Sequence, residues 1–170
     1  MKRGDRARDF EEAAETHLDD VHALLVYLTG DRATAEELTA ETFARAFERW
    51  DRYDPRRGAA RTWLCQVARS TALDHFRAED RRRRREGRYA VEEARETAEP
   101  VFGDGLSPAL ERALAQLSAA EREVVALRVV LELDGDGAAH VLGISTSACS
   151  TRLSRALQKL EKEVSAGVAA

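Results

Sequence analysis

Apolar residues return at intervals of three and four along almost the whole chain, which is the period of an α-helix and not of a β-strand. The pattern is clearest in residues 8–29, where the stripe consists of Phe10, Ala13, Ala14, His17, Leu18, Val21, Leu24, Leu25 and Leu28. No segment shows strand alternation over a useful length. Only three Pro and ten Gly interrupt 170 residues, and Ala, Leu, Glu and Arg are good helix formers. The sequence therefore predicts an all-α fold.

The helical pattern falls into two groups separated by a polar gap. We predict helices over residues 8–29, from about 32 to Trp50 and over 60–85. A second group covers 107–117, 119–133 and a broken pair within 136–164. Between 86 and 105 the periodicity fades and Pro100 interrupts a charged stretch. We therefore expect two small helical domains, 1–85 and 106–165, joined by a flexible linker at 86–105 and followed by a tail at 166–170.

Several helix boundaries carry recognisable end signals. Asp31 is placed to cap the second helix, and Ser107 precedes Pro108 at the start of the fourth. Ser118 with Glu121 has the spacing of a capping box, in which each residue bonds the other's backbone or side chain. These signals fix where the helices begin more firmly than the apolar pattern does.

Residues 138–160 fit a helix-turn-helix. Ala139 is small where two helices would cross closely, and Gly143 supplies the turn. Ile144 would fill the space between the helices, and Ser145 would cap the second one. The inward face of that helix would carry Cys149, Leu153, Ala156 and Leu160. In DNA-binding versions of this motif the second helix enters the major groove, although a helical hairpin that only packs has the same pattern.

Charge is segregated along the chain. Residues 11–41 hold nine acidic residues and one base, whereas residues 45–85 hold thirteen arginines and six acidic residues. Residues 1–10 and 86–170 carry net charges of +2 and −5. The overall charge of −4 hides an acidic segment followed by a basic one, which indicates two different partners.

On a helical wheel, residues 60–85 separate an apolar face from a face of arginine, Ser70 and Trp63. Cations bind phosphates, and an aromatic plane can hold an unstacked base. A solvated helix end would also be rich in arginine. Phe43, Phe47 and Trp50, spaced by four and three, favour a core role. Trp63 and Tyr53, which flank the loop at Gly58, are equally consistent with packing and with base contact.

Other classes of protein are disfavoured. The longest apolar run, residues 24–28, is far shorter than a membrane helix, and the charged N-terminus has no secretion signal. Cys65 and Cys149 form no disulfide framework or metal motif, so we expect a cytoplasmic protein without a cofactor or metal. Four scattered histidines and the lack of a nucleophile–base pair argue against an enzyme.

Three segments in this order resemble the extracytoplasmic-function (ECF) sigma factors of bacterial RNA polymerase, in the sigma-70 family. Residues 35–47 resemble the segment that binds the β′ clamp helices of the polymerase. Residues 61–77 resemble the helix that reads the −10 promoter element. Residues 117–128 with the following helix-turn-helix resemble the domain that reads the −35 element. The resemblance covers residues 10–164.

The resemblance implies three sets of contacts and no catalytic residue. Polymerase would bind through Glu36, Glu37, Leu38, Glu41, Phe43 and Arg45, with the β flap as a further site on the polymerase. The −10 element would be bound by Tyr53, Arg57, Arg61, Trp63, Arg69, Ser70, Arg77, Arg81 and Arg84. The −35 element would be bound by Thr146, Ser147, Ser150, Thr151, Arg152, Arg155 and Lys159. An anti-sigma factor is a further expected partner.

The chain departs from the family pattern at several positions. Ala40 stands where Gln is usual, and Ser70 stands where Asn is frequent. Residues 134–137 read Asp-Gly-Asp-Gly, a weak helix former that we expect to fray. Ser150 and Leu157 replace common Lys and Arg, which predicts a weak −35 contact.

Two alternatives to a sigma factor remain: a helix-turn-helix regulator that acts without polymerase, and an all-helical adaptor that binds only protein.

The tail ends in Val168, Ala169 and Ala170. This ending resembles the Ala-Ala tag that bacterial ATP-dependent proteases recognise, which predicts a degron. A frayed helix end is the alternative.

Overall fold

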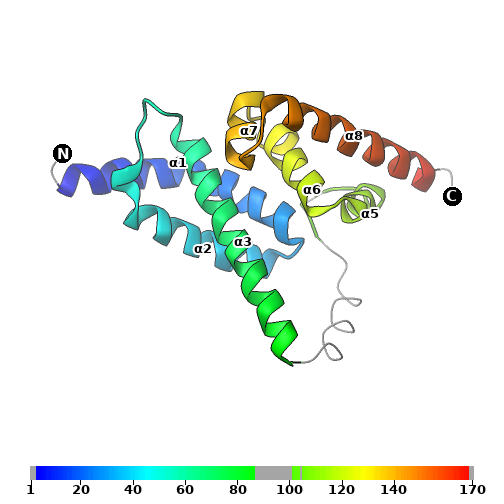
Figure 1. The fold of residues 1–170 in the computed structure, drawn as a ribbon, viewed down its shortest axis with the longest axis horizontal. Coiled ribbons are helices and arrows are strands. Elements are labelled where there is room, and N and C mark those ends of the chain that lie inside the picture. Colours follow the sequence, from blue (N-terminus) through cyan, green and yellow to red (C-terminus); the bar gives the residue numbers. More distant parts are fainter. Residues whose placement is uncertain (1–2, 87–100, 104, 169–170) are drawn as a thin grey trace.

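The computed structural model describes residues 3–86, 101–103 and 105–168, and every regular element in these ranges is helical. This confirms the predicted all-α fold. The N-terminal half contains α1 (Arg3–Thr29), α2 (Arg32–Glu48), the single 3₁₀ turn η1 (Trp50–Arg52) and α3 (Ala60–Glu86). The C-terminal half contains α5 (Pro108–Gln116), α6 (Ala119–Val125), the π turn η2 (Ala126–Val130), α7 (Gly135–Leu142) and α8 (Thr146–Val168) (Figure 1).

The three long helices of the N-terminal half share one core. Val21, Leu24 and Leu25 of α1 are at most 1% exposed, and Leu64 of α3 is fully buried. Leu38 of α2 belongs to the same buried cluster. Burying an aliphatic side chain of this size contributes about 2 kcal/mol, so the apolar stripe of each helix is the main force that assembles this half.

The predicted helix caps are present. The Asp31 carboxylate accepts a hydrogen bond from the Thr34 backbone N–H at 3.0 Å, and Thr34 holds the pKa of Asp31 below its usual range. The Ser107 hydroxyl accepts from the Leu110 N–H. Ser118 and Glu121 form both bonds of the capping box, at 2.9 and 3.3 Å. Each cap satisfies backbone donors that the first helical turn leaves without a partner.

The helix-turn-helix also has the predicted local geometry. Gly143 adopts a left-handed conformation with φ of 66° and ends α7. The Ser145 hydroxyl accepts a hydrogen bond from the Ala148 N–H at 3.1 Å. Cys149 and Ala156 face inward and are at most 1% exposed, and Ala139 is 4% exposed at the crossing with α8. Small residues at the crossing allow the two helices to approach closely.

Four sequence predictions need correction. α1 begins at Arg3 instead of residue 8, and α2 ends at Glu48, so that Trp50 lies in η1. The helix predicted for 119–133 is α-helical only to Val125 and continues as the π segment η2 to Val130, while Leu131 and Leu133 are buried in the irregular segment that follows. The Asp-Gly-Asp-Gly segment forms the first turn of α7, because the Asp134 carboxylate accepts from the Gly137 N–H at 2.6 Å.

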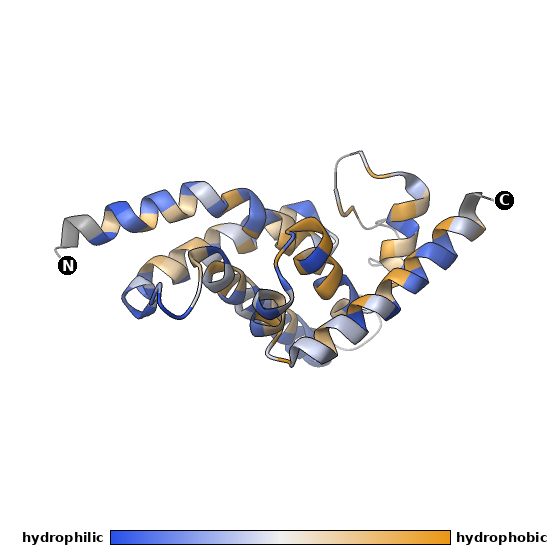
Figure 2. Ribbon diagram, turned by 90° about the horizontal axis from the view of Figure 1, so that it is seen from above, coloured by the Kyte–Doolittle hydropathy of each residue, from blue (hydrophilic) through white to orange (hydrophobic). Residues whose placement is uncertain are grey.

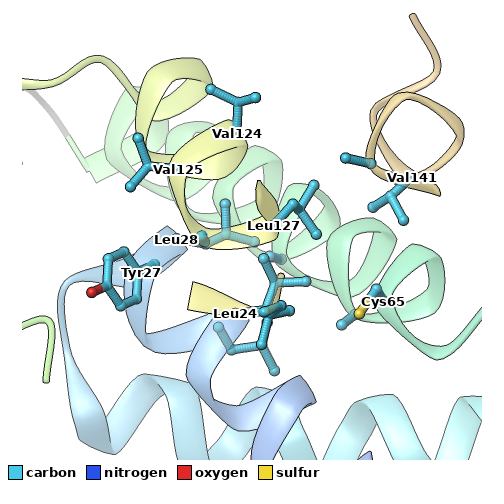
Figure 3. Close-up of a cluster of buried hydrophobic side chains, with 14 of the residues drawn as sticks. Leu24, Tyr27, Leu28, Cys65, Val124, Val125, Leu127 and Val141 are labelled. Carbon is cyan, nitrogen blue, oxygen red and sulfur yellow. The ribbon is translucent and has the colours of Figure 1, made fainter. Parts of the chain in front are cut away.

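The two halves are packed against each other. Tyr27 and Leu28 at the end of α1 lie beside Val124, Val125 and Leu127 in one hydrophobic cluster (Figure 3). Hydrophobic ribbon is most concentrated toward the middle of the molecule, where helices of the two halves meet (Figure 2). Among the described helices, none is long and apolar enough to cross a membrane.

Candidate nucleic-acid interface

The helix α3 has the two faces that its sequence predicts. Its buried face consists of Leu64, Cys65, Val67, Ala68, Thr71 and Ala72. The opposite side exposes Ser70, Arg77, Arg81 and Arg84. The Arg77 side chain is 67% exposed, although it lies 3.5 Å from the Asp74 carboxylate. The exposed arginines thus form a cationic stripe along the second half of α3, which we call the arginine face (Arg77, Arg81 and Arg84).

Two other arginines of α3 are engaged inside the molecule. The Arg61 Nε and Nη2 donate to the two carboxylate oxygens of Asp20 at 2.7 and 2.9 Å, and this bond raises the pKa of Arg61. The Arg69 Nε lies 2.5 Å from the Glu123 carboxylate of α6. Both were predicted to bind DNA, but their guanidinium groups are held by carboxylates of α1 and α6. Fewer arginines of α3 are therefore available to bind DNA than the sequence predicts.

An aromatic cluster stands at the N-terminal end of α3. Trp50 is 5% exposed and stacks on Tyr53 with ring centroids 4.6 Å apart. The Trp63 ring packs edge-on against the Trp50 ring, with centroids 5.5 Å apart. It is tilted against the Tyr53 ring, with centroids 5.8 Å apart. The core prediction holds for Trp50, whereas Phe47 is 50% exposed. Tyr53 and Trp63 are partly buried and present ring surface to solvent.

A cavity of about 610 Å³ opens beside this cluster. The loop before α3 and the first turns of α3 form one wall, which includes Tyr53, Arg57 and Trp63. Residues of α7 and its cap form the other wall, which includes Asp134 and His140. A cavity with aromatic rings and cations on one wall has the chemistry to receive an unstacked base with its phosphate.

The recognition helix α8 is less cationic. Its first turns expose Thr146, Ser147, Ser150, Thr151 and Arg155, whereas Arg152 is partly buried. The Lys159 ammonium lies 2.6 Å from the Glu121 carboxylate. Lys159, together with Ser118, lowers the pKa of Glu121 to about 2. Lys159 therefore stabilises the domain instead of extending the positive surface of α8.

The candidate polymerase surface lies on α2. Glu36, Glu37 and Glu41 are exposed, whereas Leu38 is 3% exposed and belongs to the core. Phe43 is partly buried against Phe10, with ring centroids 6.4 Å apart.

Arg45 connects this surface to α3. Its guanidinium lies 2.5 Å from Glu41 and 2.8 Å from Asp74. The bond to Arg45 holds the pKa of Asp74 below its usual range. Four of the six predicted polymerase-binding residues, Glu36, Glu37, Glu41 and Arg45, thus present charged groups on or next to the exposed side of α2.

Sequence reasoning missed several residues that connect the two halves. Phe102 lies inside the predicted linker but is 2% exposed and 5.8 Å from the Tyr27 ring. Glu123 is buried opposite Arg69, and Gln66 donates to the His140 carbonyl at 3.2 Å. No local sequence pattern pointed to these long-range contacts. The predicted degron residues Ala169 and Ala170 lie outside the described residues, as does the side chain of Val168.

Two family models match the chain. Sigma-70 region 2 matches residues 13–82, and sigma-70 region 4 matches residues 107–160. The first match contains α2, the aromatic cluster and the arginine face up to Arg81, and the second contains the helix-turn-helix.

Curated relatives agree with these matches. The ECF RNA polymerase sigma factor SigL of Mycobacterium tuberculosis is 32% identical over 170 residues, which cover 94% of each chain. SigM of Bacillus subtilis is 28% identical and covers 93% of this chain and 96% of its own length. BldN of Streptomyces coelicolor is 30% identical over 156 residues, which cover 90% of this chain but only 59% of the length of BldN.

Solved structures share the fold. The sigma factor RpoE in complex with the anti-sigma factor NepR from Bartonella quintana aligns with a TM-score of 0.72 at 22% identity, over 93% of this chain and 98% of that chain. CnrH in complex with the cytosolic domain of CnrY aligns with a TM-score of 0.68 at 23% identity, over 94% of this chain and 90% of that chain.

Proposed function

This chain belongs to the ECF RNA polymerase sigma factors of the sigma-70 family, and we propose that it directs core polymerase to promoters by contacting their −10 and −35 elements. The observation that carries the proposal is the arrangement of α3, whose N-terminal end bears a cavity wall with Tyr53, Arg57 and Trp63 and whose second half exposes a stripe of arginines. The chain supplies binding and orientation, and the polymerase supplies the chemistry.

In this proposal the N-terminal domain captures the opened −10 strand. A base turned out of the stack packs against the wall formed by Tyr53 and Trp63, near the loop at Gly58. The arginine face binds phosphates of the same strand. Single-strand binding of this kind stabilises the open state of the promoter, and it weakens as salt rises because phosphate contacts release counterions.

The C-terminal domain would place α8 in the major groove of the −35 element. The hydroxyl groups at the start of α8 offer hydrogen bonds to base edges, while its few cations provide little nonspecific affinity. We therefore propose that this domain sets position and register, and that stable binding requires assembly with polymerase.

Polymerase would bind the acidic side of α2 through Glu36, Glu37 and Glu41, with the β′ clamp helices as the partner and the β flap holding the C-terminal domain. The negative charge of α2 and the positive charge of α3 would orient the factor with α2 toward polymerase and α3 toward DNA. The similar sigma factor RpoE of Bartonella quintana was solved in complex with the anti-sigma factor NepR, and we propose a partner of that kind for this chain. The Val-Ala-Ala ending further suggests recognition by an ATP-dependent protease.

The test is transcription in vitro from a promoter library with randomised −10 and −35 regions, using bacterial core polymerase with and without the purified chain. We expect chain-dependent transcripts whose templates share two sequence elements. DNA binding without transcripts would favour the regulator that acts without polymerase. No effect on transcription and no DNA binding would favour the protein-binding adaptor.

A further inference from the structure

One acidic side chain lies on the arginine face of α3. At about 100° per residue, Asp74 lies about 60° from Arg77 and about 20° from Arg81 around the helix. Among the residues that the structure describes, it is the one carboxylate that pairs with a member of the arginine face, at 3.5 Å from Arg77. An acidic group in this place opposes DNA binding in two ways, because it repels phosphates and competes with them for Arg77.

The helix α3 by itself would favour the pair of Asp74 and Arg77. An acidic residue and an arginine three positions later lie on one side of a helix and attract each other. In the structure this pair is long, because 3.5 Å exceeds the roughly 2.8 Å of a charge-assisted hydrogen bond. The Arg77 side chain stays largely exposed. Another group therefore holds Asp74.

That group is Arg45 of α2. Its Nη1 donates to the Asp74 Oδ2 at 2.8 Å, which is the length of a full charge-assisted hydrogen bond. Its Nη2 lies 2.5 Å from the Glu41 carboxylate, one turn earlier on α2. The planar guanidinium is thus fixed by carboxylates of two helices, and it neutralises Asp74 from the side of α2.

The other acidic residues in the second half of α3 are also paired away from the arginine face. Glu79 lies 3.2 Å from Arg82 and 2.9 Å from Arg83, and Asp80 lies 4.0 Å from Arg83. Neither Arg82 nor Arg83 belongs to the arginine face. Asp74 differs from Glu79 and Asp80 because its close partner comes from another helix.

We propose that Arg45 is a positioning residue of the −10 interface: by bonding Asp74, it leaves Arg77 free to bind a phosphate of the opened strand. This inference rests on the proposed function of α3. Without Arg45, Asp74 would pair with Arg77 and neutralise one of the cations of the arginine face. Arg45 acts without touching DNA, because both of its amino groups are engaged by carboxylates.

The test compares Arg45→Ala, Asp74→Asn and the double variant in complex with core polymerase. The probe is fluorescent fork DNA whose single-stranded segment has random sequence, and core polymerase alone gives the baseline. The affinity of each chain for core polymerase is measured separately, so that every complex is assembled to saturation. Arg8→Ala, on the exposed start of α1, is the matched control because it removes the same charge far from Asp74 in the sequence.

The two single variants break the same bond, but we expect opposite effects on DNA affinity. Arg45→Ala should lower the affinity about three- to tenfold at 0.1 M salt and reduce the slope of log K against log salt by about 0.7, because one phosphate contact is lost. Asp74→Asn should raise the affinity, since it removes the carboxylate that competes for Arg77. The double variant should return to at least the parent value, and Arg8→Ala should match the parent.

A role exerted through Arg77 has a further signature. In an Arg77→Ala background, Arg45→Ala should cause no additional loss of affinity, because the cation that it protects is absent. Asp74→Asn changes a half-exposed side chain and should keep the fold, so it decides the outcome even if Arg45→Ala unfolds. Urea unfolding of each variant identifies that case.

A fall in affinity with Asp74→Asn equal to that with Arg45→Ala would show that the bond only holds α2 against α3, and would overturn the positioning role. An undiminished effect of Arg45→Ala in the Arg77→Ala background would overturn it as well. Both results leave the proposed function intact, because the parent chain still binds DNA. If no variant, the parent included, raises DNA binding above core polymerase alone, the −10 interface is refuted and the positioning role with it.

Discussion

The helices α3 and α8 are both long, both carry an exposed polar face and both are assigned to DNA, but their polar faces differ in chemistry. The exposed face of α3 carries Arg77, Arg81 and Arg84, whereas the exposed start of α8 carries mainly Ser and Thr. Arginines bind phosphates at any sequence, and hydroxyl groups bond base edges only when the helix is already in place. In the proposed function, we therefore expect α3 to supply affinity and α8 to supply register.

The two helices also differ in the partners of their other cationic side chains. On α8, Lys159 is bound to Glu121 of its own domain. On α3, Arg69 is bound to Glu123 of the other domain. The cation of α8 is thus paired within one domain, whereas the cation of α3 is paired across the contact between the two domains.

The largest expected effect is loss of the arginine face. Arg77→Ala, Arg81→Ala and Arg84→Ala combined should lower affinity for single-stranded −10 DNA about a hundredfold at low salt. The slope of log K against log salt should fall by about 2, because roughly 0.7 counterion is released per single-strand phosphate. Titrations at several salt concentrations measure both values.

The matched control for this triple variant removes Arg8, Arg49 and Arg112, which are exposed elsewhere, and so changes the net charge equally. If the control loses as much affinity as the triple variant, net charge and not the arginine face governs binding.

A smaller effect is expected from α8. Arg152→Ala with Arg155→Ala should weaken binding to a −35 duplex by about three- to tenfold, because at most two phosphate contacts are removed. Gel-shift titration of the polymerase complex on a selected promoter measures this change. A loss as large as that of the α3 triple variant would break the distinction between the two helices.

A substitution that adds a cation to α8 should make its polar face more similar to that of α3. Ser150→Lys adds a cation on the exposed side of α8 and should raise affinity for −35 duplex DNA by roughly threefold, in a salt-dependent manner. Ser150→Gln adds length without charge and is the control. An equal gain from the glutamine variant would show that contact area and not charge limits α8.

The smallest expected effect concerns stability. Lys159→Ala should lower the free energy of unfolding by less than about 1 kcal/mol, because the Lys159 side chain is 56% exposed and its ion pair is screened. Urea unfolding of the full chain measures this change.

The pH dependence of this effect has a defined sign. Since folding lowers the pKa of Glu121 to about 2, its contribution to stability is present above the usual glutamate range and lost as pH falls from about 4.5 toward 2. Lys159→Ala should therefore flatten the decline in stability over that range. An unchanged acid profile would mean that Lys159 does not set the Glu121 pKa.

The sequence predicted most features that depend on residues a few positions apart. The caps at Asp31, Ser107 and Ser118 and the turn at Gly143 follow from side chains bonding backbone groups within one helical turn, and these predictions were confirmed. The Asp-Gly-Asp-Gly segment was misjudged because intrinsic helix propensity was weighed without the cap that Asp134 supplies.

Features that depend on distant residues were beyond sequence reasoning. Glu123 is 54 positions from Arg69, and no local pattern distinguishes a buried glutamate that pairs across domains from an exposed one. The same applies to Phe102, which stands in a polar stretch and gains its burial from α1. The roles of the individual site residues stay predictions, because the fold places them and does not show what they bind.

The central claim is that α3 supplies the affinity for the promoter and α8 supplies its register. The direct measurement is the dissociation constant of the polymerase complex on a fork DNA that carries both elements from the library, compared for the α3 triple and α8 double alanine variants. The account predicts that the triple variant loses at least ten times more affinity than the double variant, and that only the double variant relaxes the spacing between the elements. Equal losses, or relaxed spacing in the α3 variant, would contradict it.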